Sequence, residues 1–200
     1  MIGSAHQHLV HGRRVEVLAR HLADLLPRDS SVLDVGAGDG HLADRVAQLR
    51  PDLRLIGVDV LVRAGARIPV QPFDGTRLPF DDNGVDAVMM IDVLHHASDQ
   101  QTLLRETARV AKRRVVIKDH MVRGPLARPT LRFMDWVGNA RHGVALPYAY
   151  WSEDQWREAF DRFGLRVTAR RDQLGLYPWP ASMLFERGLH FMAALEPGTA

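Results

Sequence analysis

The sequence predicts an α/β fold in which helices cover both faces of a doubly wound, mostly parallel sheet. Short apolar runs of strand length alternate along the chain with segments whose apolar residues recur at helical spacing. Most of these runs are apolar at nearly every position, which is typical of parallel strands that are buried on both faces. A glycine-rich turn follows the first run, where sheets of this class commonly bind a ligand.

Seven apolar runs and four helical segments make up the predicted order of elements. The strands are expected at residues 31–35, 53–58, 68–73, 85–91, 114–117, 165–169 and 189–195. The helices are expected at residues 8–26, 42–49, 103–111 and 154–163. The first two helices end before Pro27 and Pro51. Since no helix of normal length separates the last two strands, they are expected to pair antiparallel at one side of the sheet.

Length and composition predict a single globular domain. The chain has 200 residues, of which 46% are hydrophobic and 25% charged, so it is not a disordered, collagenous or coiled-coil sequence. The sequence contains no cysteine, which excludes a disulfide scaffold, a thiolate nucleophile and cysteine-bound zinc or iron–sulfur sites.

Charge and hydropathy argue against a nucleic-acid partner and against a membrane-spanning segment. The sequence pI is about 9.4, but the net charge is only +2, and the high pI reflects arginine, since only two of the 26 basic residues are lysines. No run of like charges marks a nucleic-acid patch. The first residues contain no apolar signal segment, and no stretch of about 18 uncharged apolar residues occurs. We therefore expect a cytoplasmic protein with no membrane span that binds no nucleic acid.

The expected ligand site lies at the carboxyl ends of the strands, where the connecting loops converge in sheets of this kind. Each of these ends is polar and acidic. They carry Asp34 with the turn of residues 36–40, Asp59, Asp74, Asp92 with His95 and His96, and Asp119 with His120.

The turn at residues 36–40 favours a cationic cofactor over a dinucleotide. The dinucleotide fingerprint G-x-G-x-x-G/A is not met, since residue 41 is histidine. Asp34 and Asp39 would also repel the pyrophosphate that such a turn normally binds. A ligand with an adenosyl group, a sulfonium and an ammonium would instead be attracted, and the glycines would let its amino-acid part approach the backbone. S-adenosyl-L-methionine has these groups and is the predicted cofactor.

Three segments of residues 31–120 carry a family resemblance: VLDVGAGDG, GVDV and FDGTRLPFDDNGVDAVMMIDVLHHASD. With them the chain resembles the class I S-adenosylmethionine-dependent methyltransferases, especially the bacterial small-molecule (type 11, ubiquinone/menaquinone-biosynthesis-like) group. The resemblance implies a Rossmann-like methyltransferase fold with seven strands, the last one reversed. It also implies that the glycines border the methionine part, that Asp59 binds the ribose and that Asp74 lies by the adenine. The cofactor-binding residues so implied are Asp34, Gly36, Gly38, Gly40, Asp59, Asp74, Asp92 and His95.

Several of these residues also have a purely structural interpretation. Asp34 and Asp59 are able to cap helices, and Asp74 followed by glycine is an ordinary turn signal. Asp39 is expected to cap the following helix. Because His95 and its neighbour His96 point in different directions at a helix start, at most one of them is expected to face the ligand.

The catalytic residues are less constrained, because methyl transfer depends chiefly on alignment and needs a base only if the acceptor must lose a proton. His120 and His142 are the predicted bases, since an imidazole titrates near neutrality, with a pKa of about 6.5. Asp119 either orients His120 or joins a metal site with Asp92 and Asn139. No spacing supports a metal specifically, and none is predicted.

A long connection, residues 121–151, is expected to form the acceptor side of the site. Its aromatic and polar residues suit a partly hydrophobic acceptor held by a few polar anchors. The alternative is a helix that packs Leu131, Met134 and the pair Trp136 and Val137 onto the sheet.

The predicted function is transfer of a methyl group from S-adenosyl-L-methionine to a small-molecule acceptor. The chain would comprise an N-terminal helical lid (1–27), a cofactor-binding core (31–120), the acceptor-side insert (121–151) and a C-terminal helix and strand pair (152–200). Two alternatives stay open: a cofactor-binding regulatory module without turnover, and an RNA or protein methyltransferase. An RNA enzyme would be expected to show a basic stripe or an added RNA-binding domain.

Overall fold

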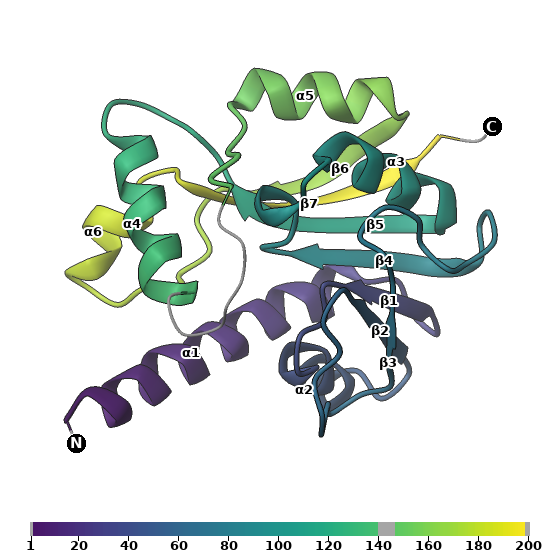
Figure 1. Cartoon of the computed structure of the whole chain (residues 1–200), viewed down its shortest axis with the longest axis horizontal. Coiled ribbons are helices and arrows are strands. Elements are labelled where there is room, and N and C mark those ends of the chain that lie inside the picture. The colour runs from purple at the N-terminus through teal and green to yellow at the C-terminus, as the bar shows by residue number, and fades with distance from the viewer. Residues whose placement is uncertain (1, 140–146, 199–200) are drawn as a thin grey trace.

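The strands form one seven-stranded sheet (Figure 1). The computed structural model describes residues 2–139 and 147–198, with side chains for residues 12–137 and 147–198. The order across the sheet is β3-β2-β1-β4-β5-β7-β6, and β7 runs antiparallel to the six other strands. The predicted fold, with a reversed last strand, is therefore confirmed. The strands are β1 (Ser31–Val35), β2 (Arg54–Asp59), β3 (Val70–Pro72), β4 (Val85–Ile91), β5 (Ala111–His120), β6 (Leu165–Arg171) and β7 (His190–Pro197).

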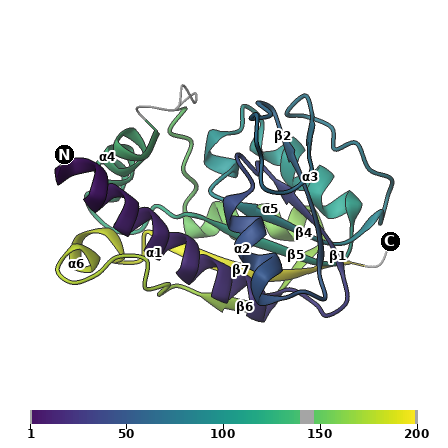
Figure 2. The same cartoon turned by 90° about the horizontal axis from the view of Figure 1, so that it is seen from below.

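Helices cover both faces of the sheet, with α1 and α2 on one side and α3 and α5 on the other (Figures 1 and 2). α4 and α6 lie together beyond one end of the sheet (Figure 1). None of the described helices is both long and apolar enough to cross a membrane. The helices are α1 (Ile2–Leu25), α2 (His41–Leu49), α3 (Gln100–Val110), α4 (Ala127–Asn139), α5 (Glu153–Arg162) and α6 (Ala181–Phe185), with a short 3-10 turn η1 (Leu94–His96).

Alternate residues of the central strands pack into two separate cores. Val32 of β1 and Met89 of β4 are buried against α1 and α2. Their chain neighbours Leu33 and Val88, which pair with each other across β1 and β4, are buried in the core that includes α3 and α5. Both faces of each strand are covered, which explains why the strands are apolar at successive positions.

The predicted boundaries are most accurate for the two inner strands β1 and β4, whose predicted and observed ranges are identical. The edge strand β3 is shorter than the predicted range 68–73 and pairs only with β2. β5 extends beyond the predicted range 114–117 at both ends, since it lies between β4 and β7 and has partners on both sides.

The insert at residues 121–151 contains α4. Leu131 of this helix packs with Tyr150 in a small core. Met134 is partly buried beside it. Trp136 and Val137 are 58% and 51% exposed, so the interpretation that this pair packs onto the sheet is wrong. The physical reason is helical spacing, since positions 131, 134 and 135 share one side of α4 and position 136 lies on another.

Candidate functional site

The turn after β1 holds three glycines in the left-handed backbone region, with φ of 75°, 59° and 71° at Gly36, Gly38 and Gly40. A Cβ at Gly36 would lie 2.6 Å from Val93 Cγ2, and one at Gly40 would lie 2.8 Å from Ile68 Cγ1, so packing closes both positions. A Cβ at Gly38 would meet nothing within 4 Å in the described part of the chain. The backbone of Gly38 is therefore open to a ligand.

Two acidic side chains, Asp59 and Asp34, come to this turn from the ends of β2 and β1. Asp59 Oδ2 accepts a hydrogen bond from the Gly38 N–H at 2.8 Å, and its Oδ1 accepts one from the Leu61 N–H at 2.8 Å. Burial and the charge of Asp59 raise the pKa of Asp34 to about 8. Asp34 is thus largely protonated at pH 7, and a cation bound nearby would favour its ionised form.

Asp74 and Asp39 accept hydrogen bonds within their own loops. Asp74 Oδ1 accepts from the backbone N–H groups of Thr76 and Arg77, at 2.7 and 2.9 Å, and from the Thr76 hydroxyl at 2.8 Å. These hydrogen bonds lower the pKa of Asp74. Asp39 Oδ1 accepts from the His41 N–H at 3.1 Å and so satisfies a donor at the start of α2. One oxygen of each carboxylate is therefore held by the local turn.

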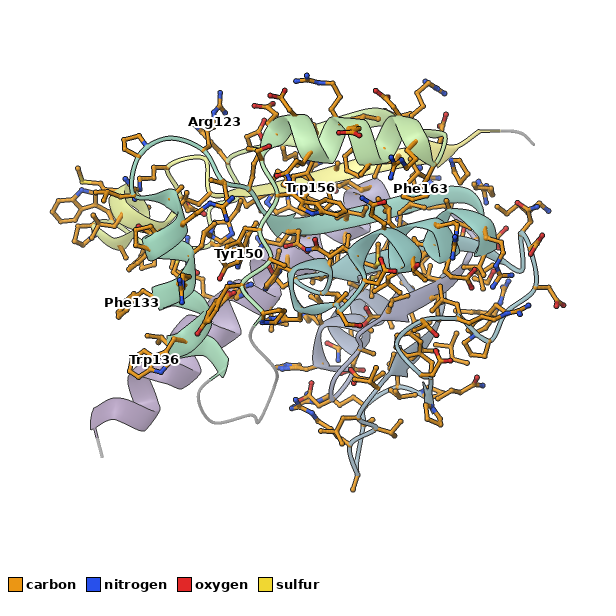
Figure 3. All side chains as sticks on the ribbon, turned by 45° about the horizontal axis from the view of Figure 1, so that its top comes forward. Arg123, Phe133, Trp136, Tyr150, Trp156 and Phe163 are labelled. Atoms are coloured by element: carbon orange, nitrogen blue, oxygen red, sulfur yellow. The ribbon has the colours of Figure 1, made fainter. Side chains whose placement is uncertain are left out.

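A cluster of titratable side chains lies at the carboxyl ends of β4 and β5. Its members come from six parts of the chain: the ends of β4 and β5, η1, α4, the segment before α5 and the start of β7. His190 of β7 pairs in register with His120 of β5. Figure 3 shows Tyr150 between α4 and the sheet. The histidine cluster consists of Asp92, His95, His96, Lys118, Asp119, His120, Asp135, Tyr150 and His190.

Asp92, which directly follows β4 with a φ of 59°, forms ion pairs with Lys118 and Arg14. Burial by itself would raise the pKa of Asp92, but the charges of Lys118 and Arg14 hold it well below its usual value. The Lys118 side chain is completely buried, and its Nζ lies 3.2 Å from His190 Nδ1. Burial lowers the pKa of Lys118. Since Arg14 belongs to α1, the N-terminal helix supplies one of the charges of the site.

Asp119 orients His95. Its Oδ1 lies 2.6 Å from His95 Nδ1 and accepts the His120 backbone N–H, also at 2.6 Å. Its Oδ2 accepts the Leu94 N–H at 3.1 Å. Burial would lower the pKa of His95, but the Asp119 carboxylate raises it overall. The interpretation in which Asp119 orients the His120 ring is therefore wrong.

The His120 ring is oriented by Asp135 instead. His120 Nε2 lies 3.2 Å from Asp135 Oδ1, while Asp135 Oδ2 accepts the Tyr150 hydroxyl. The His120 and His95 rings stack with their centroids 4.4 Å apart. His120 Nδ1 is buried and has no hydrogen-bond partner among the described residues. Burial lowers the pKa of His120 most, and the charges of His95 and Lys118 lower it further. The pKa therefore lies well below its usual value, and the imidazole is neutral at pH 7.

Residues 7–170 of the chain match the model of a methyltransferase domain. The chain belongs to this methyltransferase family. The demethylmenaquinone methyltransferase of Roseiflexus castenholzii is 32% identical over 120 residues, which cover 56% of this methyltransferase and 50% of that protein. The 27-O-demethylrifamycin SV methyltransferase of Amycolatopsis mediterranei is 29% identical over 110 residues, 48% of this chain and 40% of that protein. The chain thus matches half or less of the length of these curated relatives.

Solved structures share the fold of this methyltransferase over nearly its whole length. A chain of the complex between the Haloferax volcanii Trm112 methyltransferase activator and a putative methyltransferase superposes with a TM-score of 0.71 at 18% identity, covering 98% of this chain and 96% of that one. A putative methyltransferase from Bacillus halodurans superposes with a TM-score of 0.66 at 17% identity, covering 92% and 99%. The resemblance to class I methyltransferases and the Rossmann-like fold are therefore confirmed.

Two groups of donor atoms in the histidine cluster lie within 4.8 Å of one another, as a metal site requires: Asp92, His95 and His120, and His95, His96 and Asp135. In the first group, the Asp92 carboxylate is already paired with the cations Lys118 and Arg14. That no metal is needed stays a prediction. The other predicted base, His142, lies outside the described residues.

Sequence reasoning assigned no role to three residues of the candidate site: Arg14, Lys118 and His190. Lys118 did carry a signal, since it is one of only two lysines and follows the apolar run that predicts β5. Arg14 lies 78 residues from Asp92, and His190 lies 72 residues from Lys118. No local pattern predicts contacts at such separations.

Proposed function

We propose that this methyltransferase binds S-adenosyl-L-methionine and methylates a small-molecule acceptor. The proposal is carried by the convergence, at one edge of the sheet, of the open Gly38 backbone, the Asp59 carboxylate and the neutral His120. These residues follow or end parallel strands β1, β2 and β5, whose carboxyl ends face the same side. When bound, the cofactor supplies a methyl group on a cationic sulfur that an acceptor atom attacks directly.

On the cofactor side, the residues present fit this ligand. Gly38 leaves room for it against the backbone, and Asp59 offers two carboxylate oxygens that suit the paired hydroxyls of a ribose. The carboxylates of Asp39 and Asp59 beside the turn disfavour a pyrophosphate and favour a cation. Asp34 is protonated at pH 7 in the free protein, and its pKa of about 8 lets it ionise when a cation binds beside it.

On the acceptor side, His120 is suited to accept a proton. Donation from its Nε2–H to Asp135 leaves the lone pair on Nδ1, which has no hydrogen-bond partner among the described residues and lies 3.8 Å from Asp92 Oδ1. An acceptor hydroxyl or amine bound there would transfer its proton to Nδ1 as its oxygen or nitrogen takes the methyl group. Because the cluster is buried, the reactive end of the acceptor has to be small. The names of two relatives, which refer to demethylmenaquinone and 27-O-demethylrifamycin SV, support a small-molecule acceptor.

The cofactor assignment is tested by calorimetric titration of S-adenosyl-L-methionine into the wild type and the variant Asp59→Asn. Loss of charge-assisted hydrogen bonds is expected to weaken binding by about 10- to 100-fold. Asp161→Asn, an exposed acid on α5, is the matched control and is expected to leave the affinity unchanged. Equal affinity of the wild type and Asp59→Asn, or tighter binding of NADH than of S-adenosyl-L-methionine, would refute the assignment.

The role of His120 is tested by methyl transfer from radiolabelled S-adenosyl-L-methionine to a panel of phenols, quinols and amines. His120→Gln is expected to bind the cofactor as the wild type does and to lower turnover by about 10²- to 10⁴-fold. His21→Gln is the control, since His21 contacts the backbone of Leu174 away from the cluster. Wild-type turnover of His120→Gln on an acceptor that the wild type methylates would show that His120 is not the base.

A further inference from the structure

The end of the molecule formed by α4 and α6 exposes an unusual number of large apolar side chains. Phe133 and Trp136 on α4 are 54% and 58% exposed, and in Figure 3 both point away from the sheet. Trp179, just before α6, is 80% exposed. The α4–α6 surface is defined by these residues and their exposed apolar neighbours: Leu126, Phe133, Trp136, Val137, Trp179, Met183 and Leu184.

Contacts between the two segments make this one continuous surface. Arg187, which follows α6, donates hydrogen bonds to the Leu126 carbonyl at 3.4 Å and to the Thr130 hydroxyl at 2.8 Å. Beneath them, Leu189 packs with Leu131 in the small core under α4. Figures 1 and 2 agree that α4 and α6 occupy the same end of the molecule.

The charges around the apolar side chains are almost all positive. Arg128 and Arg132 are exposed on α4, and Arg187 and Arg123 are exposed beside it. The ranges 121–139 and 177–189 contain only two acids. Asp135 is buried in the histidine cluster, and the other, Glu186, accepts a hydrogen bond from a backbone N–H. The surface thus combines aromatic and aliphatic groups with arginines, the composition of proteins that lie on anionic bilayers.

We propose that the α4–α6 surface binds the interface of an anionic lipid bilayer, with Phe133, Trp136 and Trp179 at headgroup depth and the arginines paired with lipid phosphates. A second copy of the chain suits this surface less well. A two-fold interface would bring Arg128, Arg132 and Arg187 of both copies together without acids to pair them. The surface is separate from the histidine cluster, so the proposal goes beyond the proposed methyl transfer and does not depend on it.

The test is cosedimentation of the full chain with vesicles of two kinds. We expect binding to vesicles that contain phosphatidylglycerol and no binding to vesicles of phosphatidylcholine alone. Replacing Arg128 and Arg132 by Gln is expected to weaken binding by about fivefold for each arginine. Trp136→Ser is expected to weaken it by about tenfold or more. The matched controls Arg105→Gln on α3 and Leu61→Ser after β2 remove an exposed arginine and an exposed leucine elsewhere and should bind as the wild type does.

Tryptophan fluorescence provides a second readout that does not depend on a disruptive variant. Lipids with brominated chains are expected to quench the wild type. The double variant Trp136→Phe, Trp179→Phe should still bind but lose the quenching, since its remaining tryptophans, Trp151 and Trp156, are partly or fully buried. No binding to phosphatidylglycerol vesicles, equal losses in the control variants, or a lipid-free dimer that Trp136→Ser converts to a monomer would each overturn the proposal.

Discussion

The buried Asp34 carboxyl should make the stability of the protein fall as the pH rises. In the native state burial and Asp59 raise the pKa of Asp34 from 3.8 to about 8. The stabilisation by Asp34 is therefore fully present below the unfolded-state pKa and is lost as the pH rises towards the native one. Between pH 5 and pH 7, at about 1.4 kcal/mol per pKa unit, this single residue removes roughly 2–3 kcal/mol of unfolding free energy.

Asp34→Asn, which cannot ionise, should not show this loss. Urea unfolding at pH 5 and pH 7 is therefore expected to show the variant gaining roughly 2–3 kcal/mol relative to the wild type, or about 1 M in midpoint for a slope of about 2 kcal/mol/M. Asp86→Asn is the matched control. Hydrogen bonds from the Ser31 N–H and hydroxyl lower the pKa of Asp86, so its effect should be the same at both pH values. A stability difference for Asp34→Asn that does not change with pH would refute the reasoning.

Two further predictions concern stability. Lys118→Met leaves the partly buried Asp92 with Arg14 as its remaining cationic partner among the described residues and should cost about 1–3 kcal/mol in urea unfolding. If Lys118 and Asp92 act as a pair, Asp92→Asn will cost less in the Lys118→Met background than in the wild type, and additive costs would contradict this. Asp99→Ala removes the side chain that accepts the Thr102 N–H at 2.9 Å at the start of α3, which should cost about 1 kcal/mol and lower the Tm by about 2–4 °C in calorimetry. An unchanged Tm would show that water replaces this cap.

The fold was predictable because the signals for it are local. β1 and β4 are apolar runs bounded by polar residues, and both of their faces are buried, so strand length and burial are visible in the sequence itself. α4 was harder. Its large apolar residues Phe133, Trp136 and Val137 face outward, and a polar residue, Asp135, faces inward, which inverts the usual pattern of a packed helix.

The candidate site was predictable only in part, for a related reason. Topology placed His120 at the correct edge of the sheet, because the carboxyl ends of parallel strands meet there. Which carboxylate contacts the His120 ring depends on how α4 docks. Asp135 of α4 contacts it, whereas Asp119, the nearest acid in sequence, contacts His95. Whether Asp59, Asp74 and the other predicted residues bind the cofactor stays a prediction, which the proposed titration tests for Asp59.

The position of β7 between β5 and β6 has a consequence for synthesis on the ribosome. β5 lies inside the finished sheet, yet one of its edges has no partner until residues 190–197 have been translated. Until then the nascent chain presents an open edge of apolar backbone, the kind of edge that joins to other chains. Pairing of β7 therefore both protects this edge and delivers His190 to its place opposite His120.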